Sequence, residues 1–242
     1  MKLEELVGES EWAAVNATGR PYVLYKFAAT LDGRIAAADG TSQWITSEDS
    51  RREVHLLRAG CHATMVGSGT QQADDPNLAV RDHDDPRLDR SRLLADRQPF
   101  RVVVDSNART PVNAMVLNDA APTIIAVAED ADAGHLEGKA QVLRISRAER
   151  GGLDLQELLH ELHGLGVQAV FLEGGPTLAG SFVHAGLVDR VVAYIAPALL
   201  GAGKAGLVGA GMTTMADILR LNVIHVERSG PDVRIIAKPG AR

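Results

Sequence analysis

Short hydrophobic runs alternate with helical patterns along most of the chain. Runs typical of β-strands lie at 22–29, 63–66, 101–105, 123–128, 141–145, 168–172 and 190–196. Apolar residues recur at helical spacing in 47–59, 153–165 and 177–185. Two final runs, 221–228 and 233–238, flank Ser229-Gly230-Pro231-Asp232, which is typical of a hairpin turn. This order predicts an α/β fold with a mixed, mostly parallel central sheet, flanking helices and antiparallel C-terminal strands.

Capping residues mark where two of these helices are expected to begin. Thr46 is a candidate N-cap, with Asp49 three residues later. Asp154 and Glu157 give the same signal for the helix at 153–165. Such side chains accept hydrogen bonds from backbone N–H groups that have no acceptor within the first helical turn.

The pattern also predicts how the chain is divided. Residues 1–19 predict a short amphipathic helix that ends near Gly19 and forms an N-terminal extension. No linker divides the rest, so 20–242 is expected to be a single domain. The polar stretch 82–98 is either a mobile loop over a site or a solvated insertion, and its composition favours the insertion.

The composition is that of a globular protein. Hydrophobic residues make up 45% and charged residues 23%, both near the average for soluble domains. Lys and Arg number 25 against 31 Asp and Glu, a net charge of -6 without a basic stripe, so no nucleic-acid partner is expected. We also expect no membrane partner and a cytoplasmic location, because no apolar run reaches about 18 residues and no secretion signal is visible. The single cysteine, Cys61, excludes an internal disulfide and a Cys-rich zinc site.

Two glycine-rich turns, 66–70 and 173–180, each follow a predicted strand. Glycine lets a backbone approach a phosphate closely, and a helix beginning at Pro176 or Thr177 would direct free N–H groups at an anion. Neither turn has the spacing of a Rossmann or P-loop motif. Each is either an ordinary tight connection or part of a ligand site at the carboxyl edge of the sheet.

A few charged residues are candidates for ligand contacts. Arg58 and Arg81 could bind a phosphate or carboxylate, or form exposed salt bridges. Lys26 lies inside an apolar run, so it either points into a site or reaches solvent from an edge strand. Asp74 and Asp75 are adjacent on the chain and would point to opposite sides, which favours a turn over a metal site. The eight histidines form no zinc motif, so we expect no metal.

Several longer motifs occur in a fixed order. They are 26–36 (KFAATLDGRIA), 40–46 (GTSQWIT), 54–59 (VHLLRA), 66–70 (VGSGT), 74–78 (DDPNL), 173–178 (EGGPTL), 186–189 (GLVD) and 196–201 (APALLG). The series resembles the reductase domain of the bacterial bifunctional riboflavin-biosynthesis deaminase-reductases, and it covers about residues 20–238.

The resemblance implies a dihydrofolate-reductase-like fold that binds NADPH and reduces the ribosyl group of a pyrimidine 5′-phosphate to a ribityl group. By position, the implied cofactor contacts are Ala28, Trp44, Thr70, Asp74, Ser106, Gly175, Pro176, Thr177, Leu178, Ala179, Gly180 and Ser181. The implied substrate contacts are Lys26, Ser42, Arg58, Leu78, Arg81 and Glu173. Reduction at carbon also requires a proton, and we expect Lys26 and Glu173 to be the catalytic pair that manages it.

The sequence departs from the bifunctional proteins in one respect. Their zinc deaminase needs a His-Glu pair and two cysteines, whereas only 19 residues and no cysteine precede this region, so a stand-alone reductase is expected. Whether the pyrimidine is deaminated before reduction stays open. A dihydropterin or dihydrofolate reductase and a non-catalytic NADPH-binding protein are the alternatives.

A homodimer is also implied by the resemblance. The apolar run 191–200 could pair across a two-fold axis, or it could be a buried central strand, because both give the same pattern.

Overall fold

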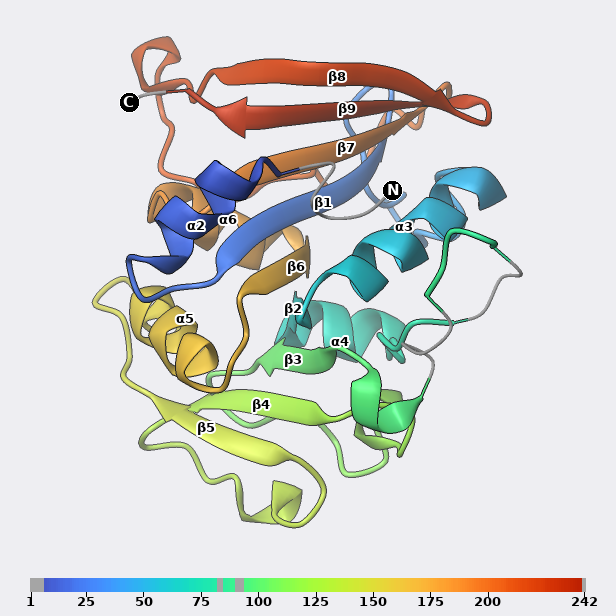
Figure 1. The fold of residues 1–242 in the computed structure, drawn as a ribbon. Coiled ribbons are helices and arrows are strands. Elements are labelled where there is room, and N and C mark those ends of the chain that lie inside the picture. The colour runs from blue at the N-terminus through green and yellow to red at the C-terminus, as the bar shows by residue number, and fades with distance from the viewer. Residues whose placement is uncertain (1–6, 82–84, 90–93, 241–242) are drawn as a thin grey trace. The chain divides into compact units, whose positions relative to one another are not determined.

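The computed structural model describes residues 7–81, 85–89 and 94–240 (Figure 1). The chain divides into two compact units. The first unit comprises Met1–Tyr22 and His55–Phe171, and the second comprises Val23–Val54 and Leu172–Arg242. The chain therefore leaves the first unit and returns to it before completing the second.

Four parallel strands form the sheet of the first unit. They are β2 (Ala63–Gly67), β3 (Phe100–Val104), β4 (Thr123–Ala128) and β5 (Gln141–Ile145). Their order is β5-β4-β3-β2, and every residue of β4 is buried. Because neighbouring strands run the same way, their carboxyl ends lie at one edge of this sheet.

Helices of the first unit include α2 (Glu9–Asn16), α4 (Ser68–Asp74) and α5 (Leu155–Gly164). The Asp154 side chain caps α5 by accepting the N–H groups of Gln156 and Glu157, which confirms the predicted cap. The predicted N-terminal helix is present as α2 but is shorter than expected, and its partly buried residues, Glu11, Trp12, Val15 and Asn16, share one face. Residues 1–6 of that predicted helix lie outside the described part of the chain.

The second unit combines parallel and antiparallel pairing. Strands β1 (Tyr22–Thr30) and β7 (Arg190–Ala196) are parallel, and β9 (Asp232–Pro239) pairs antiparallel with both β7 and β8 (Leu221–Ser229). Strand β6 (Ala169–Gly174) enters this unit after Phe171 and neighbours β1 on the side opposite β7. The mostly parallel sheet with antiparallel C-terminal strands confirms the predicted fold class.

The other helices among the described residues are α3 (Glu48–Gly60), α6 (Pro176–His184) and four short 3₁₀ turns, Ala95–Arg97, Met115–Leu117, Gly134–Leu136 and Met215–Asp217. Thr46 does not cap α3, because Ser47 takes that place and accepts the Ser50 N–H through its hydroxyl at 3.4 Å. The Asp232 carboxylate in turn accepts the Ser47 N–H at 2.8 Å and the Ser50 hydroxyl at 2.6 Å. The start of α3 is therefore fixed by a residue of the distant C-terminal hairpin.

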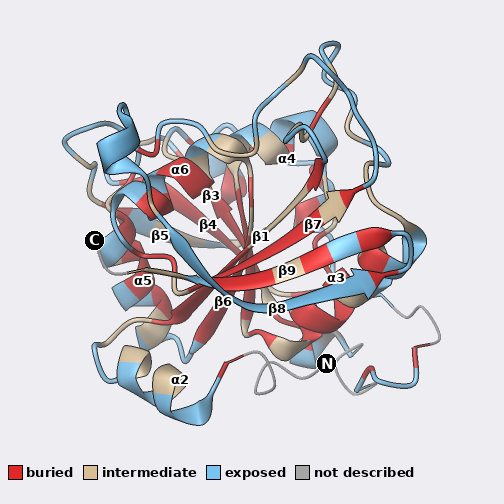
Figure 2. Ribbon diagram, turned by 90° about the horizontal axis from the view of Figure 1, so that it is seen from above, coloured by how far each residue is buried: buried red, intermediate tan, exposed pale blue. Residues whose placement is uncertain are grey.

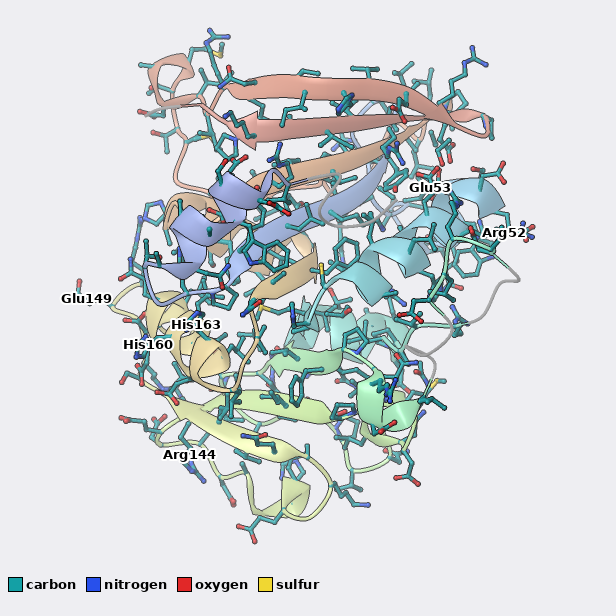
Figure 3. The ribbon with its side chains drawn as sticks, viewed as in Figure 1. Arg52, Glu53, Arg144, Glu149, His160 and His163 are labelled. Atoms are coloured by element: carbon teal, nitrogen blue, oxygen red, sulfur yellow. The ribbon has the colours of Figure 1, made fainter. Side chains whose placement is uncertain are left out.

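A buried ionic cluster ties α3 to the strands of the second unit. Glu53 projects from α3 (Figure 3) and accepts hydrogen bonds from Arg234 of β9 at 2.6 Å and from the Tyr194 hydroxyl of β7 at 3.2 Å. Arg234 also pairs with Glu227 of β8. Burial, followed by the nearby Glu53 charge, raises the pKa of Tyr194, so its hydroxyl stays protonated and can donate.

The polar stretch 82–98 is only partly described. Most of its described side chains are exposed, as expected for a solvated insertion. Leu88 nevertheless packs against Leu56, Ala59 and Val80, and the Gln98 amide both donates to and accepts from the Val80 backbone. The insertion is therefore anchored at two points. Residues 82–84 and 90–93 lie outside the described chain.

Candidate active site

Lys26 lies in the middle of β1, opposite Val192 of β7 and half-buried. Because β1 has β6 on one side and β7 on the other, the edge-strand interpretation of Lys26 is wrong. Ala28, two residues later, lies on the same face of β1 and is also half-buried. Glu173 lies near the carboxyl end of β6, the strand next to β1. The structure thus puts the two predicted catalytic residues on neighbouring strands of one unit.

The second glycine-rich turn leads directly into α6. Gly174 has a φ of +90°, Gly175 is the N-cap and Pro176 occupies the first turn, as predicted. The Ala179 N–H donates to the Gly175 carbonyl at 3.0 Å as the helix begins. The N–H groups of Thr177 and Leu178 precede that bond, so they have no acceptor within the helix and suit an anionic ligand.

Two residues of the predicted cofactor segment are buried within the protein. Ala179 and Gly180 are buried, and a Cβ at Gly180 would lie 1.8 Å from the Val208 carbonyl oxygen. The Val208 N–H also donates to the Pro176 carbonyl at 3.1 Å. The absence of a side chain at Gly180 therefore lets the 206–211 loop approach α6 closely, whereas Thr177 and Ser181 are exposed. The Ser181 hydroxyl donates back to the Thr177 carbonyl at 3.1 Å.

Trp44 is the largest exposed aromatic side chain among the described residues, with 67% of its surface accessible. The Arg51 guanidinium lies 4.4 Å from the centre of the Trp44 ring and donates to the Thr46 carbonyl at 2.7 Å. A cation over one ring face restricts the indole and leaves most of it open to a planar ligand. Ser42, two residues before Trp44, is half-buried. The sequence analysis did not predict this role for Arg51, because a charged residue in a helical pattern is usually exposed to solvent.

The first glycine-rich turn lies at the carboxyl end of β2 in the first unit. Gly67 is the N-cap of α4, and Thr70 in that helix is half-buried. A Cβ at Gly69 would meet no atom within 4 Å, so there is open space beside this turn. Asp74 is exposed at the end of α4. Asp75 has a φ of +38° and accepts the Met115 N–H at 2.9 Å, as expected for a turn residue.

Leu78 contributes its side chain to the hydrophobic core. It is 4% exposed and packs with Val103 and Val116, so any contact it makes with a ligand comes from its backbone. The preceding Asn77 carbonyl accepts a hydrogen bond from the buried Arg101 at 3.4 Å. Burial lowers the pKa of Arg101 to about 10. Arg101 was not expected to be a buried cation, because its position in a strand pattern gives no sign of it.

Arg58 and Arg81 are both placed close to His55 of α3. The Arg81 N–H donates to Nδ1 of the buried His55 at 3.2 Å. Arg58 lies three residues after His55, on the same face of the helix. Arg58 is half-buried and Arg81 is exposed. The backbone of Arg81 is therefore docked one helical turn from Arg58.

Ser106 follows β3 at the carboxyl edge of the first unit's sheet. It is half-buried, and its carbonyl accepts the Ala128 N–H at 3.2 Å. Asp105, just before it, is completely buried and accepts hydrogen bonds from the Thr110 N–H and hydroxyl at 2.7 and 2.8 Å. The described residues contain no group of three His, Cys, Asp or Glu that could hold a metal ion. They also include no helix long and apolar enough to cross a membrane.

The sequence model of the RibD C-terminal domain matches residues 21–235. The chain belongs to this family. It is 43% identical over 216 residues to the 2,5-diamino-6-ribosylamino-4(3H)-pyrimidinone 5′-phosphate reductase of Methanothermobacter thermautotrophicus, covering 88% of this chain and 96% of that protein. It is 41% identical over 223 residues to the riboflavin biosynthesis protein RibD of Escherichia coli, covering 89% of this chain and 59% of RibD.

The structure is also similar to a solved RibD. Acinetobacter baumannii RibD superposes with a TM-score of 0.81 and 30% sequence identity, over 96% of this chain and 61% of that one. The chain thus spans nearly all of the archaeal reductase but only about 60% of the RibD proteins. Membership of the RibD C-terminal domain family confirms the resemblance found in the motifs.

Proposed function

We propose that this chain is an NADPH-dependent reductase that converts the ribosyl group of a ribosylamino-pyrimidine 5′-phosphate into a ribityl group in riboflavin biosynthesis. The observation that carries the proposal is the 43% identity with a reductase of that type, matched over 96% of its length. The motifs that bear the expected contacts lie within the matched region 21–235. Because phosphorylated substrates do not cross a bilayer unaided, we propose a cytoplasmic location.

The residues expected to hold NADPH have the chemistry that the cofactor needs. The first N–H groups of α6, which no side chain caps, suit a diphosphate. The exposed Trp44 ring suits a planar base, and the space beside Gly69 leaves room next to Thr70. When bound, NADPH supplies a hydride to C1′ of the opened sugar.

The protein's own contribution is to position the substrate and to manage a proton. We assign Arg58 and Arg81, both in the first unit, to the 5′-phosphate, since a guanidinium group can bind two phosphate oxygens at once. Ser42 stays an expected substrate contact. Lys26 would donate the proton that must accompany hydride transfer, and the Glu173 carboxylate would hold the ammonium group in its charged form. Their places on adjacent strands β1 and β6 support this division of roles.

The test is NADPH oxidation by the purified chain, followed at 340 nm with two substrates. One is the 2,5-diamino-pyrimidinone phosphate and the other is its deaminated uracil counterpart. We expect turnover with at least one, and the preferred substrate shows whether deamination comes first. No oxidation with either would refute the proposal. NADPH binding without turnover would instead support a non-catalytic NADPH-binding protein. Faster turnover of dihydrofolate or a dihydropterin would support a reductase for those substrates.

A substitution tests the assigned proton donor. Lys26→Met is expected to lower kcat about 100-fold or more while leaving NADPH affinity within a few-fold, because general acid catalysis contributes about 10²–10⁴ in rate. Lys139→Met is the control, since Lys139 is an exposed lysine of the first unit, outside β8, β9 and the predicted site residues. Equal kcat values for the two variants would remove Lys26 from the catalytic role.

We further propose that the chain forms a homodimer through β8 and β9. Of the two interpretations of 191–200, the structure supports a buried central strand for Arg190–Ala196, because this segment is β7 and lies between β1 and β9. Strand β8 is instead an edge strand whose residues are exposed up to Arg228 (Figure 2). The large apolar side chains exposed on this hairpin are Leu221, Val223, Ile224, Val226 and Val233. An edge strand with this much apolar surface is typical of an interface.

Light scattering on a size-exclusion column tests the dimer. Wild type is expected to have twice the chain mass of 25.7 kDa. The double variant Val223→Lys, Val226→Lys is expected to elute as a monomer, because charges would be buried without partners. A monomeric wild type at micromolar concentration, or an unchanged dimer in the variant, would refute this interface.

A further inference from the structure

A tight loop after β3 brings one arginine back to the carboxyl edge of the first unit's sheet. Asp105 closes the loop: its carbonyl accepts the Ala108 N–H at 2.9 Å, and its carboxylate accepts two hydrogen bonds from Thr110. Ala108 has a φ of +51°, which reverses the chain direction. As a result, Nη2 of Arg109 donates to the Ser68 hydroxyl at the start of α4, at 2.9 Å.

The charge of Arg109 is only weakly compensated by the protein. Its side chain is 53% exposed, and its Nε lies 3.9 Å from Oδ1 of the buried Asp105, too far for a hydrogen bond. That Oδ1 atom has no hydrogen-bond partner among the described residues. Of the five N–H donors of Arg109, one is used on Ser68, and within the described part of the chain the guanidinium makes no other hydrogen bond. The others remain available to a ligand.

Arg147 provides a contrast within the same unit. It follows the end of β5, is 42% exposed and forms a close ion pair with Asp130 at 2.9 Å. It also donates to the Asn107 side chain at 3.2 Å. The charge of Arg147 is therefore met by a carboxylate at hydrogen-bond distance, whereas that of Arg109 is directed to solvent.

We propose that Arg109 binds the ribose 2′-phosphate of NADPH and makes the enzyme select NADPH over NADH. This inference rests on the proposed function, and specifically on the placing of Thr70 and Ser106 among the cofactor contacts. Ser106 is in the same loop as Arg109, and Thr70 is in the helix whose first residue, Ser68, holds Arg109. NADPH carries a second anionic group besides its diphosphate, and a guanidinium is the side chain best suited to bind it.

Cofactor kinetics test the assignment. Arg109→Met is expected to lower kcat/KM for NADPH about 10- to 100-fold, the value of a charge-assisted hydrogen bond or two, and to leave kcat/KM for NADH within twofold. Arg109→Lys should retain part of the preference for NADPH over NADH, because lysine keeps the positive charge but cannot donate two parallel hydrogen bonds to one phosphate. Arg147→Met, the matched control, should behave like wild type. Equal losses for both nucleotides, or the same loss in Arg147→Met, would overturn the proposal.

A binding measurement separates this inference from the proposed function. Calorimetric titration with adenosine 2′,5′-bisphosphate and with adenosine 5′-monophosphate requires no turnover. Wild type should bind the bisphosphate about 10-fold more tightly or better, and Arg109→Met should lose that difference. If the difference persists in the variant, Arg109 does not bind the 2′-phosphate. If wild type oxidises no nucleotide, the proposed function fails, yet the titration still decides the role of Arg109.

A second variant covers the case in which Arg109→Met melts well below wild type. Ser68→Ala removes a single hydrogen bond that positions the guanidinium and leaves the charge in place. It should reduce the preference for the bisphosphate about threefold. An unchanged preference in Ser68→Ala, together with an unchanged preference in Arg109→Lys, would count against the proposal.

Discussion

Gly180 of α6 gives a sharp test of how the 206–211 loop is held against the predicted cofactor segment. A Cβ added here would lie 1.8 Å from the Val208 carbonyl oxygen and 2.8 Å from its carbon. Contacts below 3.0 Å are essentially never observed for Cβ atoms, so the loop must move by 3.0 − 1.8, or 1.2 Å. Backbone atoms cannot rotate away as the end of a flexible side chain can.

The magnitude follows from what that movement disrupts. Overpacking costs about 1–3 kcal/mol, and losing the hydrogen bond from Val208 to Pro176 costs about 1 kcal/mol more. Replacing glycine by alanine within a helix raises the free energy of unfolding by about 1 kcal/mol, because alanine has the higher helix propensity. Gly180→Ala is therefore expected to lower the free energy of unfolding by about 2 kcal/mol, which corresponds to a Tm lower by roughly 4–8 °C.

Gly164→Ala is the matched control because Gly164 is also helical, at the end of α5, and a Cβ there would meet nothing within 4 Å. This variant keeps the gain in helix propensity without the clash, so its Tm should equal or exceed that of wild type. Both are measured by thermal melting followed by circular dichroism. If Gly180→Ala is as stable as Gly164→Ala, the close approach to Val208 is not a constraint and the reasoning is refuted.

Three further substitutions test other parts of the second unit. Glu53→Gln should lower the free energy of unfolding in urea by about 2 kcal/mol, because it removes one of the two carboxylates that pair with the buried Arg234; a loss below 1 kcal/mol would contradict this. Hydrogen bonds from Thr30, Gly201 and Leu200 lower the pKa of Asp32 to about 2. A lowered carboxylate pKa stabilises the fold above about pH 4 and ceases to do so as the pH falls through about 2, so Asp32→Asn should be less stable than wild type at pH 7 and equal to it near pH 2. In a Trp12→Phe background, Arg51→Met should shift the emission of Trp44 and weaken its quenching by NADPH, and unchanged spectra would exclude a positioning role.

The sequence by itself determined the order and type of nearly all the strands and long helices. Val-rich and Ile-rich runs predicted β4 and β7 with their observed bounds, because burial on both faces leaves a continuous apolar pattern. Local capping chemistry likewise located α5 through Asp154. The motifs also identified the family, since glycine, proline and charged residues at fixed spacing reflect local backbone geometry.

Tertiary structure decided what each of those residues does. The sequence pattern could not show that Leu78 is a core residue, that Lys26 lies on a central strand, or that Gly180 is packed against a distant loop. Nor could it show that Arg109 reaches Ser68, 41 residues away along the chain. Burial, strand neighbours and the partner of a charge all depend on contacts between distant segments. These contacts form only when the chain is folded, and a local pattern carries no record of them.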